Sequence, residues 1–119
     1  MQIKLKSEEA VQALSALAQD SRLAIFRLLV QQGPDGLPAG TIAKTLNLPL
    51  ATLSFHLQQL SKAGLVSSHR EGRYIFYAAN YSQMNSLIAY LSENCCRGVD
   101  RLNLNSENLS LNNCKEVLK

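Results

Sequence analysis

The stretch between residues 47 and 64 constrains the fold more than any other part of this 119-residue chain. Asn47-Leu48-Pro49 interrupts a helical pattern over 39–46, because proline does not continue a helix. From Leu50 to Ala63, leucine recurs at positions 50, 53, 57 and 60, the spacing of one helix face. Gly64 can end that helix in the left-handed conformation. Two short helices joined by a tight turn form the outline of a helix-turn-helix.

A β-hairpin pattern follows this pair of helices. Residues 65–70 and 73–78 are rich in β-branched and aromatic side chains and flank the turn-forming pair Glu71-Gly72. A helix-turn-helix followed by a hairpin is a winged helix. The sequence therefore predicts a mainly α-helical α+β fold with a small β-hairpin, in one domain over residues 1–98. For the C-terminal tail, 99–119, a flexible segment and one short helix both remain open.

Two helices are expected before the helix-turn-helix. The first covers about 7–19, with Ser7 as N-cap and an apolar stripe that includes Val11 and Leu14. The second covers 21–32, is capped by Asp20 and is apolar nearly all round, so it belongs in the middle of a core. The residues from Gly33 to Gly36 are expected to form a turn.

A last helix is expected over 81–96. Its apolar residues, continued by Cys95, recur at alternating steps of 3 and 4, like the seam of a coiled coil. The other helices and the hairpin already supply one core, so this seam and the stripe on the first helix predict a homodimer interface. Packing of both helices within the chain is the alternative. The expected interface residues are Val11, Leu14, Met84, Ile88 and Leu91.

The net charge of +3 is concentrated in the middle of the chain. Residues 36–80 carry Lys44, Lys62, Arg70 and Arg73 against Glu71 alone, whereas the segments before and after them are each neutral. A local basic surface is the electrostatic footprint of nucleic-acid binding. The helix-turn-helix and the hairpin are therefore the expected site of contact with double-stranded DNA.

Polar side chains, with one phenylalanine, are expected opposite the leucines of the 50–63 helix. Glutamine can pair with adenine, phenylalanine can meet a thymine methyl, and lysine and serine can hold phosphates. For the helix residues, the alternative is an ordinary solvated helix face. For the two hairpin arginines, the alternative is that their charges only protect the exposed hairpin against aggregation. The candidate DNA-binding residues are Lys44, Thr52, Ser54, Phe55, His56, Gln58, Gln59, Lys62, Arg70 and Arg73.

Four segments in this order closely resemble the ArsR/SmtB family of bacterial metal-responsive repressors. They are Asp20-Ser21-Arg22-Leu23-Ala24-Ile25, Leu53-Ser54-Phe55-His56-Leu57-Gln58-Gln59-Leu60, Ala63-Gly64-Leu65-Val66 and Arg70-Glu71-Gly72-Arg73-Tyr74-Ile75-Phe76-Tyr77. The resemblance implies a homodimer built by the first and last helices, which binds operator DNA and releases it when a ligand binds. The chain departs from the family at Pro49-Leu50-Ala51, where many members have a serine-type cap.

The three cysteines are an odd number, and two of them are adjacent, so they fit no disulfide framework. Cys95-Cys96 near the end of a helix resembles the arsenic-sensing branch of the family. That resemblance implies trivalent arsenic or antimony as inducer, bound by Cys95 and Cys96, with Cys114 as candidate third ligand. A sensor of methylated trivalent arsenicals, which need only two thiolates, and a thiol-based redox sensor of the same fold remain open.

Several classes of protein are not expected. No apolar run approaches the length of a membrane helix, and no signal-peptide pattern opens the chain, so a cytoplasmic protein without a membrane partner is expected. No catalytic set, phosphate-binding loop or cofactor fingerprint occurs, so neither an enzyme nor a permanent cofactor is expected. A winged-helix module that binds protein instead of DNA is the remaining alternative.

Overall fold

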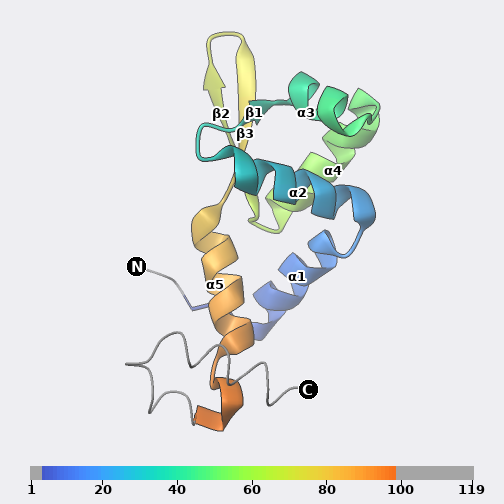
Figure 1. Ribbon diagram of the computed structural model, residues 1–119. Coiled ribbons are helices and arrows are strands. Elements are labelled where there is room, and N and C mark those ends of the chain that lie inside the picture. The colour runs from blue at the N-terminus through green and yellow to red at the C-terminus, as the bar shows by residue number, and fades with distance from the viewer. Residues whose placement is uncertain (1–3, 99–119) are drawn as a thin grey trace. The chain divides into compact units, whose positions relative to one another are not determined.

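The computed structural model describes residues 4–98 (Figure 1). The chain divides into two units, Met1–Ile88 and Ala89–Lys119, and each is considered by itself. The helices are α1 (Ser7–Leu17), α2 (Asp20–Gln32), α3 (Ala39–Leu46), α4 (Leu50–Lys62), α5 (Tyr81–Ser92) and the 3₁₀ helix η1 (Cys95–Gly98). The strands are β1 (Leu37–Pro38), β2 (Val66–Glu71) and β3 (Tyr74–Ala79). The predicted winged helix-turn-helix with a small hairpin is thereby confirmed.

The three strands form one antiparallel sheet in the order β1-β3-β2. Glu71 and Tyr74 are the last pair of the hairpin, so the turn is Gly72-Arg73, one residue later than predicted. Gly72 has a φ of 65°, which glycine adopts without strain. The sequence pattern missed β1, because a strand of two residues that contains proline carries almost no periodic signal.

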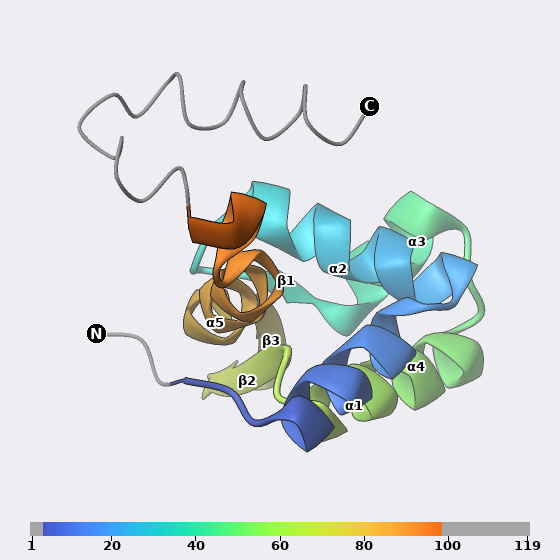
Figure 2. The same cartoon turned by 90° about the horizontal axis from the view of Figure 1, so that it is seen from below.

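The core lies where α2, α3, α4 and the start of β2 meet. Ile25, Leu29, Ile42, Leu53 and Leu60 are among its fully buried side chains. α1 packs on α2 and α4, and Figure 2 shows it alongside α4. Its inward face consists of alanines at 10, 13 and 16 rather than the larger residues of the predicted stripe.

The two N-terminal helix caps differ from prediction by one residue. Lys6, not Ser7, precedes α1, and its backbone N–H donates to Glu9 Oε1 at 2.9 Å. Gln19, not Asp20, caps α2, because its side-chain oxygen accepts from the backbone N–H of Arg22 at 2.9 Å. α2 is also less enclosed than predicted, since Leu23 is 45% exposed.

α5 begins on well-defined anchors. Asn80 donates from Nδ2 to the carbonyl of Gly64 at 2.9 Å, and its Oδ1 accepts from the backbone N–H of Gln83. The hydroxyl of Tyr81 donates to the carbonyl of Val30 at 2.9 Å. The helix ends at Ser92, not at 96, so Cys95 lies in η1 and does not continue the α-helical seam. The predicted tail and Cys114 lie outside the described residues.

Candidate nucleic-acid interface

α4 is held by a buried face that differs from the predicted one. Leu53, Leu57 and Leu60 are buried as expected, but Leu50 is 57% exposed at the first turn. His56 takes the fourth inward position and is only 8% exposed. The prediction of Leu50 as a core residue and of His56 as an accessible DNA contact is therefore wrong.

His56 is bound inside the protein by Arg22 of α2. Its Nδ1 lies 3.3 Å from Nη1 of Arg22. Burial lowers the pKa of His56 below the usual value of 6.5, and the positive charge of Arg22 lowers it further. His56 thus links α4 to α2 in its neutral form.

The opposite face of α4 is exposed, as predicted. Phe55 is 53% exposed, which is unusual for a large apolar side chain within an otherwise polar surface. Gln59 is only half-buried and lies toward α1, so it sits at the edge of this face. The exposed candidates on α4 are Thr52, Ser54, Phe55, Gln58 and Lys62.

An open groove of about 570 Å³ lies between α4 and the hairpin. Ser54, Phe55 and Gln58 line it from α4, and the cross-strand partners Ser68 and Tyr77 line it from the sheet. Sequence reasoning missed Ser68 and Tyr77, because only the strand register shows which hairpin residues face α4.

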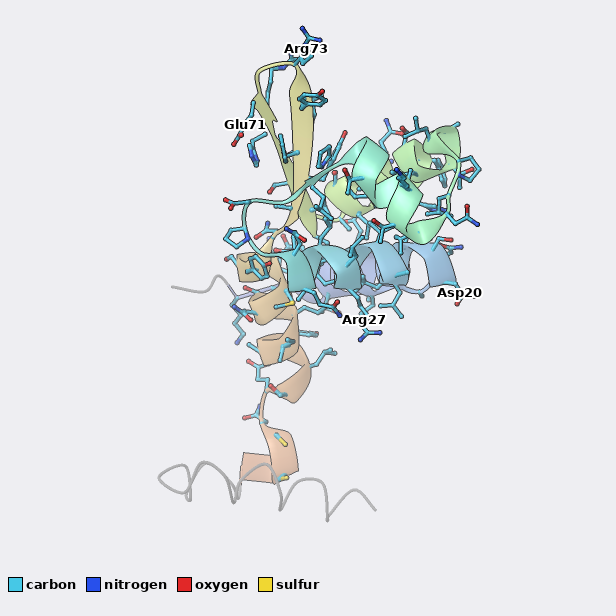
Figure 3. All side chains as sticks on the ribbon, turned by 45° about the horizontal axis from the view of Figure 1, so that its top comes forward. Asp20, Arg27, Glu71 and Arg73 are labelled. Atoms are coloured by element: carbon cyan, nitrogen blue, oxygen red, sulfur yellow. The ribbon has the colours of Figure 1, made fainter. Side chains whose placement is uncertain are left out.

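The same register places Arg70 on the groove side of the hairpin. Side chains alternate between the two faces of a strand, so Arg70 and its partner Ile75 share a face with Ser68 and Tyr77. Arg73 lies in the turn, and Figure 3 shows it at the tip of the hairpin. Within residues 4–98, no carboxylate pairs with either arginine. Both guanidinium groups are therefore available for an anionic partner.

The other face of the hairpin is occupied by interactions within the chain. His69 Nε2 lies 3.2 Å from Glu71 Oε2, and the imidazole stacks on Phe76 with ring centroids 5.6 Å apart. The one acidic residue of the basic segment thus faces away from the groove. Lys44 is exposed on the last turn of α3 and adds a positive charge on the helix that precedes α4.

The adjacent cysteines lie in the second unit. The Sγ atoms of Cys95 and Cys96 are 3.5 Å apart, so the two side chains are in contact. Cys96 is disulfide-bonded, which corrects the prediction that the cysteines form no disulfide. Cys96 has a φ of 56°, a left-handed conformation that lets the chain turn sharply there. No group of three or more His, Cys, Asp or Glu side chains suited to a metal occurs within residues 4–98.

Comparison with known proteins agrees with this geometry. A family model described as a helix-turn-helix domain matches residues 17–69. The HTH-type transcriptional regulator YgaV of Escherichia coli is 30% identical over 95 residues, 80% of this chain and 94% of that protein. The cadmium resistance transcriptional regulatory protein CadC of Listeria innocua is 38% identical over 61 residues, 51% of this chain and 50% of that protein.

A solved structure is also similar to this chain. The homodimeric winged helix-turn-helix DNA-binding domain of Mb0332 from Mycobacterium bovis, a possible ArsR-family regulator, is 29% identical, with a TM-score of 0.58. The match covers 73% of this chain and 81% of that one. In the part of the chain that is described, no helix has the length and hydropathy to cross a membrane. The chain belongs to the ArsR family of winged helix-turn-helix transcriptional regulators.

Proposed function

We propose that this regulator is a metalloid-responsive repressor. As a homodimer it binds operator DNA through α4 and the hairpin, and it leaves the DNA when trivalent arsenic or antimony binds Cys95 and Cys96. The observation that carries the proposal is the separation of 3.5 Å between the two Sγ atoms. The ligand-binding form is the reduced protein, because Cys96 is disulfide-bonded in this structure and only its thiolate can bind. Soft thiolate donors are the ligands that soft ions prefer.

The geometry of the two sulfurs supports a shared ligand atom. With metal–sulfur bonds of about 2.3 Å, sulfurs 3.5 Å apart subtend an angle of about 100° at the atom they share. That angle suits the pyramidal thiolate coordination implied by resemblance to the arsenic-sensing branch. Cys114, outside the described residues, is the proposed third ligand. The resistance to cadmium in the name of CadC supports the broader idea of a soft-metal sensor.

Exposed apolar side chains on α1 and α5 support the homodimer. Val11 is 59% exposed and Leu14 40% exposed on α1, although both are aliphatic. Ile88 and Leu91 of α5 are 54% and 59% exposed, and Met84 is half-buried. A second copy of the chain would cover these residues, as in the homodimeric relative from Mycobacterium bovis.

Release from DNA needs only modest coupling between the metalloid site at the cysteines and the DNA-binding surface of α4 and the hairpin. A coupling free energy of about 1–3 kcal/mol changes an affinity roughly 5- to 150-fold. The proposed path is α5, which contains the dimer-forming residues and directly precedes the two cysteines in the chain. In this mechanism the bound metalloid changes the pairing of the two α5 helices, and with it the spacing of the two α4 helices on DNA.

DNA release measured by fluorescence anisotropy tests the proposal. The DNA is a site that the reduced protein selects from a random pool. Arsenite should release the wild type, whereas a Cys95→Ser/Cys96→Ser variant should bind with wild-type affinity and stay bound. Release of that variant by arsenite would refute the proposal. The Cys114→Ser variant tests whether Cys114 is the third ligand. If it is, arsenite should no longer release this variant from DNA, whereas methylarsenite should still release it.

Thiol oxidation is a second candidate function, and the same contact between Cys95 and Cys96 favours it. In the reduced protein, in which Cys96 is a thiol, peroxide would oxidise one of the two thiols to a sulfenic acid, and the other thiol would displace water to form a disulfide. Titration of the DNA complex with peroxide and with arsenite separates the two functions. Release by peroxide at concentrations at which arsenite has no effect would favour the redox sensor.

A further inference from the structure

A small polar pocket lies on the side of α4 away from the hairpin groove, where α4 meets α1 and the start of α2. It has a volume of about 190 Å³. Its polar lining consists of Gln12, Ser15, Arg22, Gln59 and Lys62. The lining contains two cationic side chains and no carboxylate. We propose that this pocket binds an oxyanion group of the size of phosphate.

Arg22 is held ready for such a ligand. Its Nε donates to the carbonyl of Ala16 at 2.6 Å, and Nη1 donates to His56 at 3.3 Å. Both bonds fix the plane of the guanidinium, so little side-chain entropy is lost when an anion binds. Among the described residues, Nη2 has no hydrogen-bond acceptor. Nη2 therefore keeps donors for a ligand in the pocket.

The remaining lining residues complete a set of donors. Lys62 is exposed and has no ion-pair partner within residues 4–98, so its ammonium group can close over an anion. The amides of Gln12 and Gln59 and the hydroxyl of Ser15 can each donate a hydrogen bond. Charge-assisted hydrogen bonds of this kind are about twice as strong as neutral ones.

The volume limits what the pocket can hold. A water molecule takes up about 30 Å³ of liquid, and pockets for drug-sized ligands begin at about 300 Å³. A volume of about 190 Å³ lies between these limits and accommodates one tetrahedral oxyanion. That oxyanion can be free in solution or can belong to the backbone of bound DNA, since Gln59 and Lys62 are part of α4. The chemistry recognised is the same in both cases.

Titration with inorganic phosphate tests the site without DNA or metalloid, so the result does not depend on the proposed function. Ionic strength is kept constant with chloride, and binding is followed by the ¹H–¹⁵N resonances of the backbone and of Arg22 Nε. We expect saturable shifts at Arg22, Gln59 and Lys62. Lys62→Gln should raise the Kd for phosphate by about tenfold or more, because it removes a charged hydrogen bond.

Arg27→Gln is the matched control, because Arg27 is exposed on α2 and does not line the pocket. It removes the same charge and should leave the Kd for phosphate unchanged. Shifts that do not saturate, or a Lys62→Gln variant that binds phosphate as the wild type does, would overturn the proposal. Circular dichroism checks that both variants fold.

A second measurement identifies the source of the anion. DNA affinity is compared in phosphate and in chloride at equal ionic strength. If the pocket takes a backbone phosphate of DNA, phosphate weakens DNA binding by the wild type but not by Lys62→Gln. If it takes a free anion, DNA affinity is the same in both buffers. Both results support the pocket as an oxyanion site, provided that the titration saturates.

Discussion

Arg22 of α2 donates a hydrogen bond from Nη1 to Nδ1 of His56 on α4, over 3.3 Å. A guanidinium has only donors, so Nδ1 must be the acceptor and the ring proton must lie on Nε2. A protonated imidazole would lose this bond and face the arginine charge inside the protein. The contact therefore couples the packing of α4 to the neutral state of one histidine.

This contact predicts a loss of stability in mild acid. Because the pKa of His56 is lowered in the folded state, the unfolded chain takes up a proton below about pH 6.5 while the folded chain does not. The free energy of unfolding should be constant above pH 6.5 and should fall below it, until the pH reaches the lowered pKa. Urea denaturation between pH 5 and 7.5 measures the effect.

His56→Gln should remove most of this pH dependence, because glutamine can accept from Arg22 but does not titrate. His69→Gln is the control, since His69 is exposed on the hairpin and its replacement leaves the buried histidine in place. An equal pH dependence in the wild type and in His56→Gln would contradict the prediction.

His56 also shows why the buried face of α4 was only partly predictable. Four leucines at helical spacing indicate a helix and its approximate inner side, and three of them are buried. A buried histidine depends on a partner 34 residues away in sequence, which local periodicity does not reveal. Leu50 is exposed because it lies on the first turn of the helix, where its neighbours no longer enclose it.

The inward face of α1 was missed for a different reason. A pattern search expects the largest apolar residues to be buried, but α1 turns Ala10, Ala13 and Ala16 toward its neighbours. Small side chains let two helices approach closely, and the sequence alone does not tell how close they are. Helices α3 and α4 were predicted almost to the residue, since turn-forming and helix-ending residues mark their ends.

Gly36 is predicted to be essential for pairing of β1. It has a φ of 78°, and a Cβ added there would lie 2.8 Å from the carbonyl carbon of Tyr77 in β3. Gly36→Ala must either strain the backbone or separate β1 from β3. We expect a loss of about 2 kcal/mol or more in the free energy of unfolding, measured by urea denaturation.

Gly40→Ala is the matched control for Gly36→Ala. Gly40 lies inside α3, and a Cβ there would meet nothing within 4 Å. Alanine should therefore stabilise the protein by about 0.5–1 kcal/mol, because it restricts the unfolded chain and favours helix. Similar effects of both substitutions would show that the close approach at Gly36 is unimportant.

Phe55→Ala is predicted to weaken DNA binding without unfolding the protein. Phe55 is 53% exposed, so the loss of its buried half should lower the free energy of unfolding by only about 1 kcal/mol. Covering its exposed half on DNA is worth about 1 kcal/mol in each subunit of the dimer, so the Kd for DNA should rise about 30-fold. Leu23→Ala, on the exposed side of α2, should leave the Kd unchanged. Unchanged affinity of Phe55→Ala would remove this residue from the interface.

The hairpin arginines are predicted to contact DNA phosphates. Arg70→Gln and Arg73→Gln should each reduce the magnitude of the slope of log K against log salt concentration by about two, because each removes one phosphate contact from both subunits of the dimer. The loss of affinity should be similar for different DNA sequences, since phosphates carry no sequence information. Fluorescence anisotropy at several salt concentrations measures both quantities. If neither slope changes, the charged hairpin does not reach the backbone.

Leu14→Glu is predicted to separate the dimer while each chain keeps its fold. Leu14 is 40% exposed on α1, so glutamate is solvated in the separated chain. A two-fold interface contains the substitution twice, and each lost leucine contact is worth about 1.5 kcal/mol. The dissociation constant of the dimer should therefore rise about a hundredfold, as measured by analytical ultracentrifugation. Leu23→Glu, at a leucine that is 45% exposed but lies on α2, should remain dimeric. Dissociation of both variants alike would argue against an interface through α1.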